Sequence, residues 1–410
     1  MLDETLIELS QVFLQSKSQQ YQRYFMGKQF ALTERFSILL GQRGVGKTTL
    51  LIQHLLNYVA LDALNQKILY IPVDHFLVTK HSLYEIAKNF QMMGGEFIAF
   101  DEIHKYNNWS LELKSIYDTY PNLKMIASGS AALKIHRGSH DLSRRAIIYN
   151  IPGLSFREYL ELKLTLQLPS YNLPTLLSDH QKIANMITQK LQNEKIIPLF
   201  HSYLEYGYYP YFYDLNDVSK FKLTLEQNVH VSLESDLPAV YPKLTNISIN
   251  KIKKLLVFIA NNVPYTPNWN TLKNFLEIGD ERTLKTYLCY LEDAGLITLL
   301  YKASKQLDKL ESPKKLYLQN SNLMYTITDL TANKGTVREM FFYNQLKMAH
   351  QLTLPMDGDF LVDDQFVFEV GGNKKSFAQL KNRQQAYVAS DNIEIGINNK
   401  IPLWLFGFLY

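Results

Sequence analysis

The sequence predicts an α/β protein built from several domains. Three observations support this prediction. Apolar, strand-like runs alternate with amphipathic segments in the first part of the chain, and a glycine loop joins one such run to a helix. Later segments take helical spacing before short strands return near the end. With 410 residues, the chain is long enough for two to four domains that each bury a core.

Composition narrows the class of protein. Hydrophobic residues are 46% and charged residues 20%, which is ordinary for a globular protein, while 27 Tyr indicate well-filled cores or stacking surfaces. The single cysteine, Cys289, excludes an internal disulfide framework and a cysteine-based metal site. The acidic start of the chain and the lack of a long apolar run predict a soluble, cytoplasmic protein. A net charge of +4 is too small to indicate nucleic acid by itself.

Residues 36–55 have the pattern of a strand, a glycine loop and a helix. The loop fits G-x-x-x-x-G-K-[ST], and a chance glycine turn would not explain the strand and helix in register on either side. Glycines let backbone N–H groups close around a phosphate, and the helix N-terminus adds positive potential. Lys47 is expected to reach the β and γ phosphates of ATP, and Thr48 to bind Mg²⁺. The predicted nucleotide-binding residues are Gly41, Gln42, Arg43, Gly44, Val45, Gly46, Lys47, Thr48 and Thr49.

A later apolar strand, 97–100, runs into Asp101 and Glu102, the pattern of a Walker B motif. Asp101 is expected to coordinate Mg²⁺, and Glu102 to orient or deprotonate the water that attacks ATP. A solvated strand end would also place two acids here. The preceding phosphate loop and the intervening strand favour the catalytic interpretation.

Three further features have two interpretations each. Ser128 and Ser130 end another strand, where either could hydrogen-bond the γ-phosphate or the water, or simply form a turn. Arg144 and Arg145 could act as an arginine finger for a neighbouring subunit, or form a solvated turn. Arg23, in the helical lead-in, could lie by a nucleotide base or on a solvated helix face.

These segments resemble bacterial and archaeal AAA-type ATPases in which the ATPase core is joined to a C-terminal nuclease-like domain of the PD-(D/E)xK type. The resemblance rests on GQRGVGKTTL, FIAFDEIHKYNNW, MIASGSAAL and IPGLSFREYL. It implies a P-loop sheet with an additional strand between the Walker A and Walker B strands. The predicted division is a helical lead-in (1–35), an AAA-type P-loop core (36–160), a helical lid (161–241), a winged helix-turn-helix (242–328) and a restriction-endonuclease-like α/β domain (329–410).

The middle of the chain is helical in pattern and rich in aromatic residues, with HSYLEYGYYPYFYD at its centre. Such rings could stack on bases, but the few basic residues among them favour a packed lid. Three helical patterns and two short strands then follow in the order typical of a winged helix. Double-stranded DNA is the expected partner, and a protein-interaction module is the alternative. The candidate DNA contacts are Arg282, Lys285, Lys302, Lys305 and Lys309.

The last domain resembles a metal-dependent nuclease fold. The resemblance maps the acids of its site onto Glu339, Asp359 and Glu369, which could hold a divalent metal that activates water. Where the family has Glu-x-Lys, this chain has Glu369-Val370-Gly371, so a shifted lysine would have to supply the cation. We therefore expect a degenerate fold used for binding or assembly. The remaining candidates for this site are Lys374 or Lys375, and Gln379.

The predicted function is ATP hydrolysis, with Mg²⁺, whose nucleotide state controls a DNA-binding winged helix and the nuclease-like domain. One alternative is an ATP-gated, metal-dependent DNA nuclease. Another is a nucleotide-switched protein scaffold that does not bind nucleic acid. A homo-oligomer would follow from the arginine-finger interpretation of Arg144 and Arg145, because an arginine finger acts between subunits.

Overall fold

A computed structural model describes residues 3–17, 21–23, 32–135, 142, 144–191, 193–302, 313–328, 332–375, 383 and 385–410. The chain divides into two compact units. Unit 1 comprises residues 1–153 and 231–244, and unit 2 comprises residues 154–230 and 245–410. The predicted lid range, 161–241, therefore has residues in both units. Among the described residues, no helix is long and apolar enough to cross a membrane.

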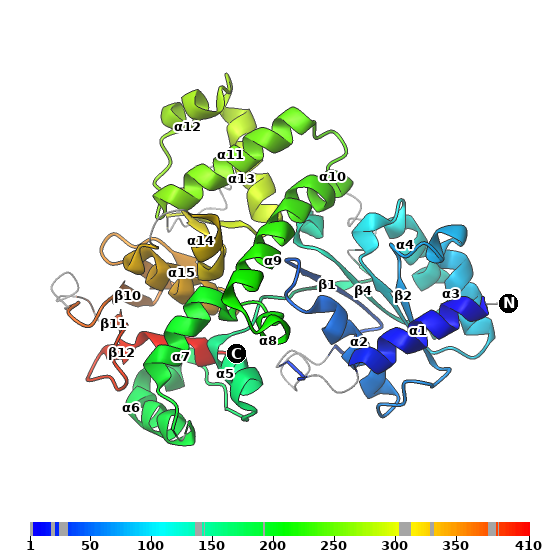
Figure 1. Cartoon of the computed structure of the whole chain (residues 1–410), viewed down its shortest axis with the longest axis horizontal. Coiled ribbons are helices and arrows are strands. Elements are labelled where there is room, and N and C mark those ends of the chain that lie inside the picture. The colour runs from blue at the N-terminus through cyan, green and yellow to red at the C-terminus, as the bar shows by residue number, and fades with distance from the viewer. Residues whose placement is uncertain are drawn as a thin grey trace. The chain divides into compact units, whose positions relative to one another are not determined.

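A five-stranded parallel sheet forms the centre of unit 1 (Figure 1). The strand order is β2-β3-β4-β1-β5. Strand β4 thus lies between the phosphate-loop strand β1 and the strand β3 that ends in Asp101, which confirms the expected additional strand. Strands β1, β2 and β3 are buried along their whole length, as is usual where helices cover a parallel sheet. The strands are β1 (Phe36–Gly41), β2 (Ile68–Pro72), β3 (Phe97–Asp101), β4 (Lys124–Ser130) and β5 (Ile147–Asn150).

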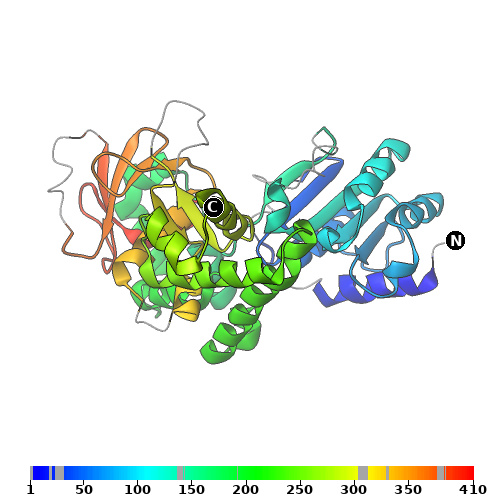
Figure 2. The ribbon, with the colours of Figure 1, turned by 90° about the horizontal axis from the view of Figure 1, so that it is seen from above.

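Helices flank this sheet, and in Figure 2 α1 runs along one side of unit 1. Helix α1 packs against α2 and β2, and α3 packs against α4. A capping box begins α3, because Ser82 and Glu85 each accept from the other's backbone N–H. The helices are α1 (Glu4–Lys17), α2 (Lys47–Tyr58), α3 (Leu83–Met92), α4 (Trp109–Thr119) and α10 (Leu237–Val240), with the short 3-10 helices η3 (Val78–Lys80), η4 (Ile103–Lys105) and η5 (Ala131–Ile135) and the π-helix η8 (Ser232–Asp236).

The first part of unit 2 is helical and has an aromatic core. Tyr203, Tyr208 and Tyr209 are each only 2% exposed, and Phe156 packs against the ring of Tyr203. These rings are therefore not available to stack on bases, in agreement with the packed interpretation. The elements are α5 (Phe156–Leu164), α6 (Leu173–Lys190), α7 (Ile196–Ser202), η7 (Tyr203–Gly207), α8 (Phe212–Leu215) and α9 (Val218–Val231).

Three helices and a strand pair follow in the predicted order. Strands β6 and β7 pair antiparallel, and residues 303–312 between them lie outside the described residues. Tyr265, between the first two helices, also pairs with Leu316 of β7 through two backbone hydrogen bonds of 3.1 and 2.8 Å. The elements are α11 (Asn246–Asn262), α12 (Trp269–Leu276), α13 (Glu281–Asp293), β6 (Ile297–Leu300), β7 (Lys315–Leu318) and α14 (Ser321–Ile327).

A second five-stranded sheet, of order β12-β11-β10-β9-β8, closes unit 2. Strands β8 to β10 run antiparallel, whereas β10, β11 and β12 are parallel. Helix α15 packs on β10 and η10, with Phe342 against the rings of Phe360, Phe368 and Phe406. The elements are α15 (Lys334–Leu346), β8 (Leu352–Thr353), β9 (Phe360–Val362), β10 (Phe366–Gly371), β11 (Ala386–Ser390), β12 (Lys400–Pro402) and η10 (Leu403–Phe408).

His54 on α2 should make unit 1 sensitive to acid. Burial and the charge of Lys124 lower the pKa of His54 from 6.5 to about 4. Between these values the unfolded chain binds a proton that the folded chain does not, so the free energy of unfolding falls as the pH falls from about 6.5 to about 4. The loss has an upper bound of roughly 3 kcal/mol. Thermal unfolding across this pH range should show a shallower slope for His54→Gln, and an unchanged slope would contradict the assignment.

Candidate functional site

The phosphate loop between β1 and α2 has the backbone conformation that its glycines permit. Gly44 and Gly46 have φ values of 82° and 92°, and a Cβ on Gly41 would lie 2.5 Å from a backbone oxygen. Gly46 is the N-cap of α2, and no described side chain caps this end, which leaves the first N–H groups to an anion. Lys47 Nζ donates to the carbonyls of Gly41 at 3.1 Å and Gln42 at 2.9 Å, so the ammonium lies over the loop.

Asp101, at the end of β3, accepts hydrogen bonds from four groups. The hydroxyls of Thr48 and Tyr70 donate to Oδ2 at 2.7 Å each, while Oδ1 accepts from the Ser128 hydroxyl and, at 3.1 Å, from the N–H of Glu102. Burial and the charge of Asp101 raise the pKa of Tyr70, so its hydroxyl keeps its proton. A hydroxyl and a carboxylate in contact are suitable oxygen ligands for Mg²⁺ beside nucleotide phosphates. The residues present therefore fit the expected ion.

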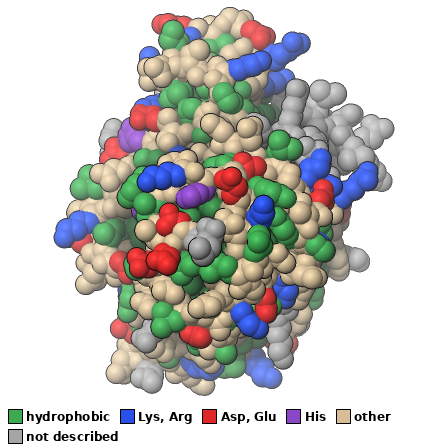
Figure 3. Space-filling view, turned by 90° about the vertical axis from the view of Figure 1, so that its right-hand side faces the viewer, with side chains coloured by type: hydrophobic (Ala, Val, Ile, Leu, Met, Phe, Trp, Pro, Cys, Tyr) green, Lys and Arg blue, Asp and Glu red, His purple; other side chains and the backbone are tan. Residues whose placement is uncertain are grey.

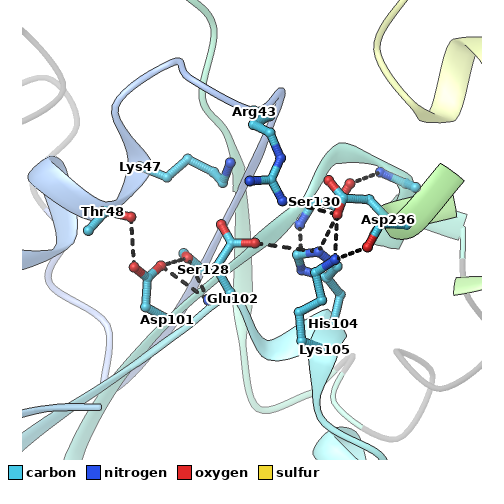
Figure 4. A network of polar contacts seen from close by, with 12 residues as sticks. Arg43, Lys47, Thr48, Asp101, Glu102, His104, Lys105, Ser128, Ser130 and Asp236 are labelled. Atoms are coloured by element: carbon cyan, nitrogen blue, oxygen red, sulfur yellow. Dashed lines mark hydrogen bonds and ion pairs between the residues drawn. The ribbon is translucent and has the colours of Figure 1, made fainter. Parts of the chain in front are cut away.

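Glu102 has a backbone conformation that non-glycine residues rarely adopt, with φ 58° and ψ 40°. Its side chain, with those of Arg43 and Lys47, points into the same region (Figure 4). Glu102 Oε2 lies 3.4 Å from His104 Nε2. Unusual backbone conformations concentrate at functional sites, which supports the role predicted for Glu102.

Asp236, at the end of the π-helix η8, brings a carboxylate from a distant part of the sequence close to Arg43 and His104 (Figure 4). Its Oδ1 lies 2.8 Å from Lys105 Nζ, 3.2 Å from Arg43 Nη2 and 3.3 Å from His104 Nε2. Burial acts to raise the pKa of Asp236, but the hydrogen bonds from His104 and Lys105 and the charge of Arg43 outweigh burial and lower that pKa. Asp236 is therefore a buried anion at neutral pH.

The buried side chain of Arg23 is hydrogen-bonded to the phosphate loop. Its side chain is 6% exposed, which shows that a solvated helix face is the wrong interpretation. The guanidinium donates to the carbonyls of Val45 at 3.0 Å, Pro152 at 2.8 Å and Gly153 at 2.8 Å. The Val45 carbonyl belongs to the loop itself, so Arg23 ties the loop to the segment that follows β5.

The other predicted residues of unit 1 fall into two groups. Ser128 reaches Asp101, and the N–H of Ser130 donates to His104 Nδ1 at 3.2 Å, so both lie at the centre. Arg145 instead forms a two-point ion pair with Asp118 of α4, at 2.8 and 2.9 Å, and Arg144 is exposed. The arginine-finger role stays a prediction.

In unit 2, the acids predicted for the nuclease-like site lie near one another. Glu369 is 1% exposed and forms an ion pair with Lys375, so Lys375 is the one of the two candidate lysines that contacts it. Burial and the charge of Asp359 raise the pKa of Glu339, against a 2.5 Å hydrogen bond from Tyr317. Within the described ranges, no group of three or more His, Cys, Asp or Glu is arranged to hold a metal ion. Gln379 lies outside the described residues.

The candidate DNA contacts differ in their surroundings. Arg282 and Lys302 are exposed. Lys285 forms a 2.9 Å ion pair with Glu281 and lies over the ring of Trp269. Lys305 and Lys309 are outside the described residues. On the face of the molecule in Figure 3, side chains of both charges are interspersed with hydrophobic ones, and no broad area of positive charge stands out.

Comparison with known proteins finds a family match in the first part of the chain. Residues 33–160 match the family described as AAA domain. Residues 197–334 match a family described as Domain of unknown function (DUF8612). An uncharacterised protein of Methanocaldococcus jannaschii is 28% identical over 396 residues, covering 89% of this chain and 81% of that protein.

Solved structures similar to this chain are distant. The Aeropyrum pernix Orc1 protein in complex with DNA is 12% identical, with a TM-score of 0.31, over 78% of this chain and 90% of that chain. AMPPCP-bound DnaA from Aquifex aeolicus is 14% identical, with a TM-score of 0.26, over 70% of this chain and 86% of that chain. Similarity at this level carries no argument about the present chain.

Arg23→Met should weaken nucleotide binding, because three buried carbonyls lose a charged donor and the loop loses its tie to residues 152–153. A hydrogen bond to a charged group contributes about 1.5–3 kcal/mol, so the loss of one at the loop predicts roughly a tenfold or greater fall in affinity. Titration of a fluorescent ATP analogue measures it. Lys67→Met, which removes a surface ion pair with Glu96, is the control and should bind normally. Equal affinity in all three proteins would show that Arg23 does not shape the loop.

Proposed function

We propose that the AAA domain of this chain hydrolyses ATP at the junction of the phosphate loop and the end of β3. The observation that carries the proposal is the 2.7 Å contact between the hydroxyl of Thr48 and the carboxylate of Asp101. These are the two side chains that the sequence patterns assign to Mg²⁺, and they come from different elements. Lys47 and Glu102 point into the same region (Figure 4).

Each side chain then has a definite task. The loop N–H groups and Lys47 bind the phosphates, while Thr48 and Asp101 would hold Mg²⁺. Bound Mg²⁺ neutralises charge on the phosphates. Glu102 orients the attacking water and accepts its proton. Ser128 is placed to fix Asp101, and through its hydroxyl, 3.2 Å from the N–H of Glu102, the backbone of Glu102 as well.

The nucleotide state of unit 1 is proposed to control DNA binding by a winged helix over residues 242–328. The order of α11, α12, α13, β6 and β7 supports the winged helix, as does the pairing of Tyr265 with β7. Exposed Arg282 and Lys302 would contact phosphates. The chain passes between the units at three places in the sequence, so a change in unit 1 has covalent routes into unit 2.

Turnover by the purified chain with Mg²⁺, with and without double-stranded DNA, tests this function. Glu102→Gln should keep ATP binding but lower kcat by ~10²–10⁴, the range for loss of a general base. Lys47→Ala should lose both turnover and ATP binding, because a charged contact to the phosphates is removed. Normal turnover by either variant would contradict the assignment. Turnover that ignores DNA would move the partner search to proteins, and tight ATP binding with negligible turnover and no DNA binding would favour a scaffold.

The second candidate is a metal-dependent DNA nuclease in unit 2. The observation that favours it is the convergence of Glu339, Asp359 and Glu369 with the cation of Lys375, since both Asp359 and Glu339 act on the charge of Lys375. The acids as they stand are not arranged as a metal site, which weighs toward a binding role.

Cleavage of double-stranded DNA with Mg²⁺ or Mn²⁺ tests the second candidate. If unit 2 is a nuclease, Asp359→Asn and Glu369→Gln should each abolish cleavage while ATP turnover persists, because the two sites share no residues. The matched control is Asp357→Asn, an exposed acid that pairs with Arg383 and should cleave normally. Absence of cleavage by the unaltered chain with either ion would rule this candidate out.

A further inference from the structure

The surroundings of Glu102 contain more positive charge than its predicted task needs. Arg43 and Lys105 carry this charge, and the N–H of His104 adds a further donor (Figure 4). The charges of Arg43 and Glu102 act on one another. A carboxylate that must accept a proton from water should not be tied up by such donors. Whether these donors hold Glu102 depends on the carboxylate of Asp236.

The carboxylate of Asp236 lies close to all three of these side chains. A single oxygen, Oδ1, lies 2.8 Å from Lys105 Nζ, 3.2 Å from Arg43 Nη2 and 3.3 Å from His104 Nε2. The Asp236 side chain is 5% exposed, so these interactions are little screened by water. A buried carboxylate with three donors is held firmly, since removing its partners would leave an uncompensated charge.

The ring of His104 has only one proton to give in this arrangement. The N–H of Ser130 donates to Nδ1, and a backbone N–H can only donate, so Nδ1 carries no proton and Nε2 carries one. Nε2 faces Asp236 Oδ1 at 3.3 Å and Glu102 Oε2 at 3.4 Å. One N–H therefore stands between two carboxylates that compete for it.

We propose that Asp236 is a positioning residue of the hydrolytic centre, which engages His104 and Arg43 so that the carboxylate of Glu102 is left to orient the attacking water. Without the charge of Asp236, the His104 N–H has only Glu102 to bond, and Arg43 loses its buried partner and turns to Glu102. Glu102 would then be held by donors in place of water. The inference rests on the proposed ATP hydrolysis and adds to it a residue outside every motif of the AAA domain.

The test compares Asp236→Asn, His104→Gln and the double variant in the full chain. Asp236→Asn should lower kcat about tenfold, while KM and the affinity for a fluorescent ATP analogue change less than twofold. The double variant should be no slower than Asp236→Asn, because Asp236 acts through His104. Glu96→Gln, which removes one carboxylate and its ion pair with Lys67 elsewhere in unit 1, is the control and should keep the parental kcat.

Several outcomes would overturn the proposal. One is an unchanged kcat in Asp236→Asn. Another is a lower kcat that comes with a comparable fold-loss of ATP affinity and a lower melting temperature. The third is additive effects on kcat in the double variant. If Asp236→Asn does not fold, Asp236→Glu decides, since it keeps a carboxylate but moves it relative to Arg43 and His104, and it should still show a lower kcat at unchanged affinity. Absence of turnover in the parent chain would refute the proposed function instead, which separates the two failures.

Discussion

The carboxylate of Asp101 needs hydrogen-bond donors from the protein, because it is only 4% exposed and a buried polar group without partners is costly. The sheet order supplies them. Strands β2 and β4 flank β3 on its two sides, and each contributes one hydroxyl, Tyr70 from β2 and Ser128 from β4. Thr48 approaches from the start of α2. The additional strand therefore does more than separate β1 from β3, since it puts Ser128 beside the acid.

Much of unit 1 could be predicted because its signals are local. The strand, glycine loop and helix at 36–55 are adjacent in sequence, and the strand that carries Asp101 ends in its own acids. Asp236 could not be found this way, and neither could the contacts of Arg23, which the sequence only placed near the loop. Asp236 reaches the centre only after the chain has passed through unit 2, and Arg23 acts on backbone carbonyls, which no residue type identifies. His104 did have a signal, its place two residues after Glu102, but the role that we propose for it depends on Asp236.

In unit 2, periodicity predicted the order of helices and strands but not the contacts between them. The pairing of Tyr265 with β7 is a single residue long, too short for any pattern. Lys375 and Glu369 lie on opposite sides of a turn whose path decides which lysine reaches the acid, and sequence spacing alone left two candidates. The packing of the aromatic run at 201–214 could be predicted, because an aromatic ring in a core needs only apolar neighbours and no particular partner.

Residues 231–244 belong to unit 1 although they follow residues 154–230 of unit 2 in the sequence, so unit 1 is synthesised in two parts. During synthesis, the sheet and the phosphate loop leave the ribosome long before Asp236 does. Until then Arg43 and Lys105 lack the carboxylate that neutralises them, and their mutual repulsion opposes the final arrangement of the centre. Residues 154–230 are, in effect, an insertion within the sequence of unit 1. A fragment that ended at residue 160 would keep the phosphate loop and the Asp101-Glu102 pair but would lack the carboxylate of Asp236.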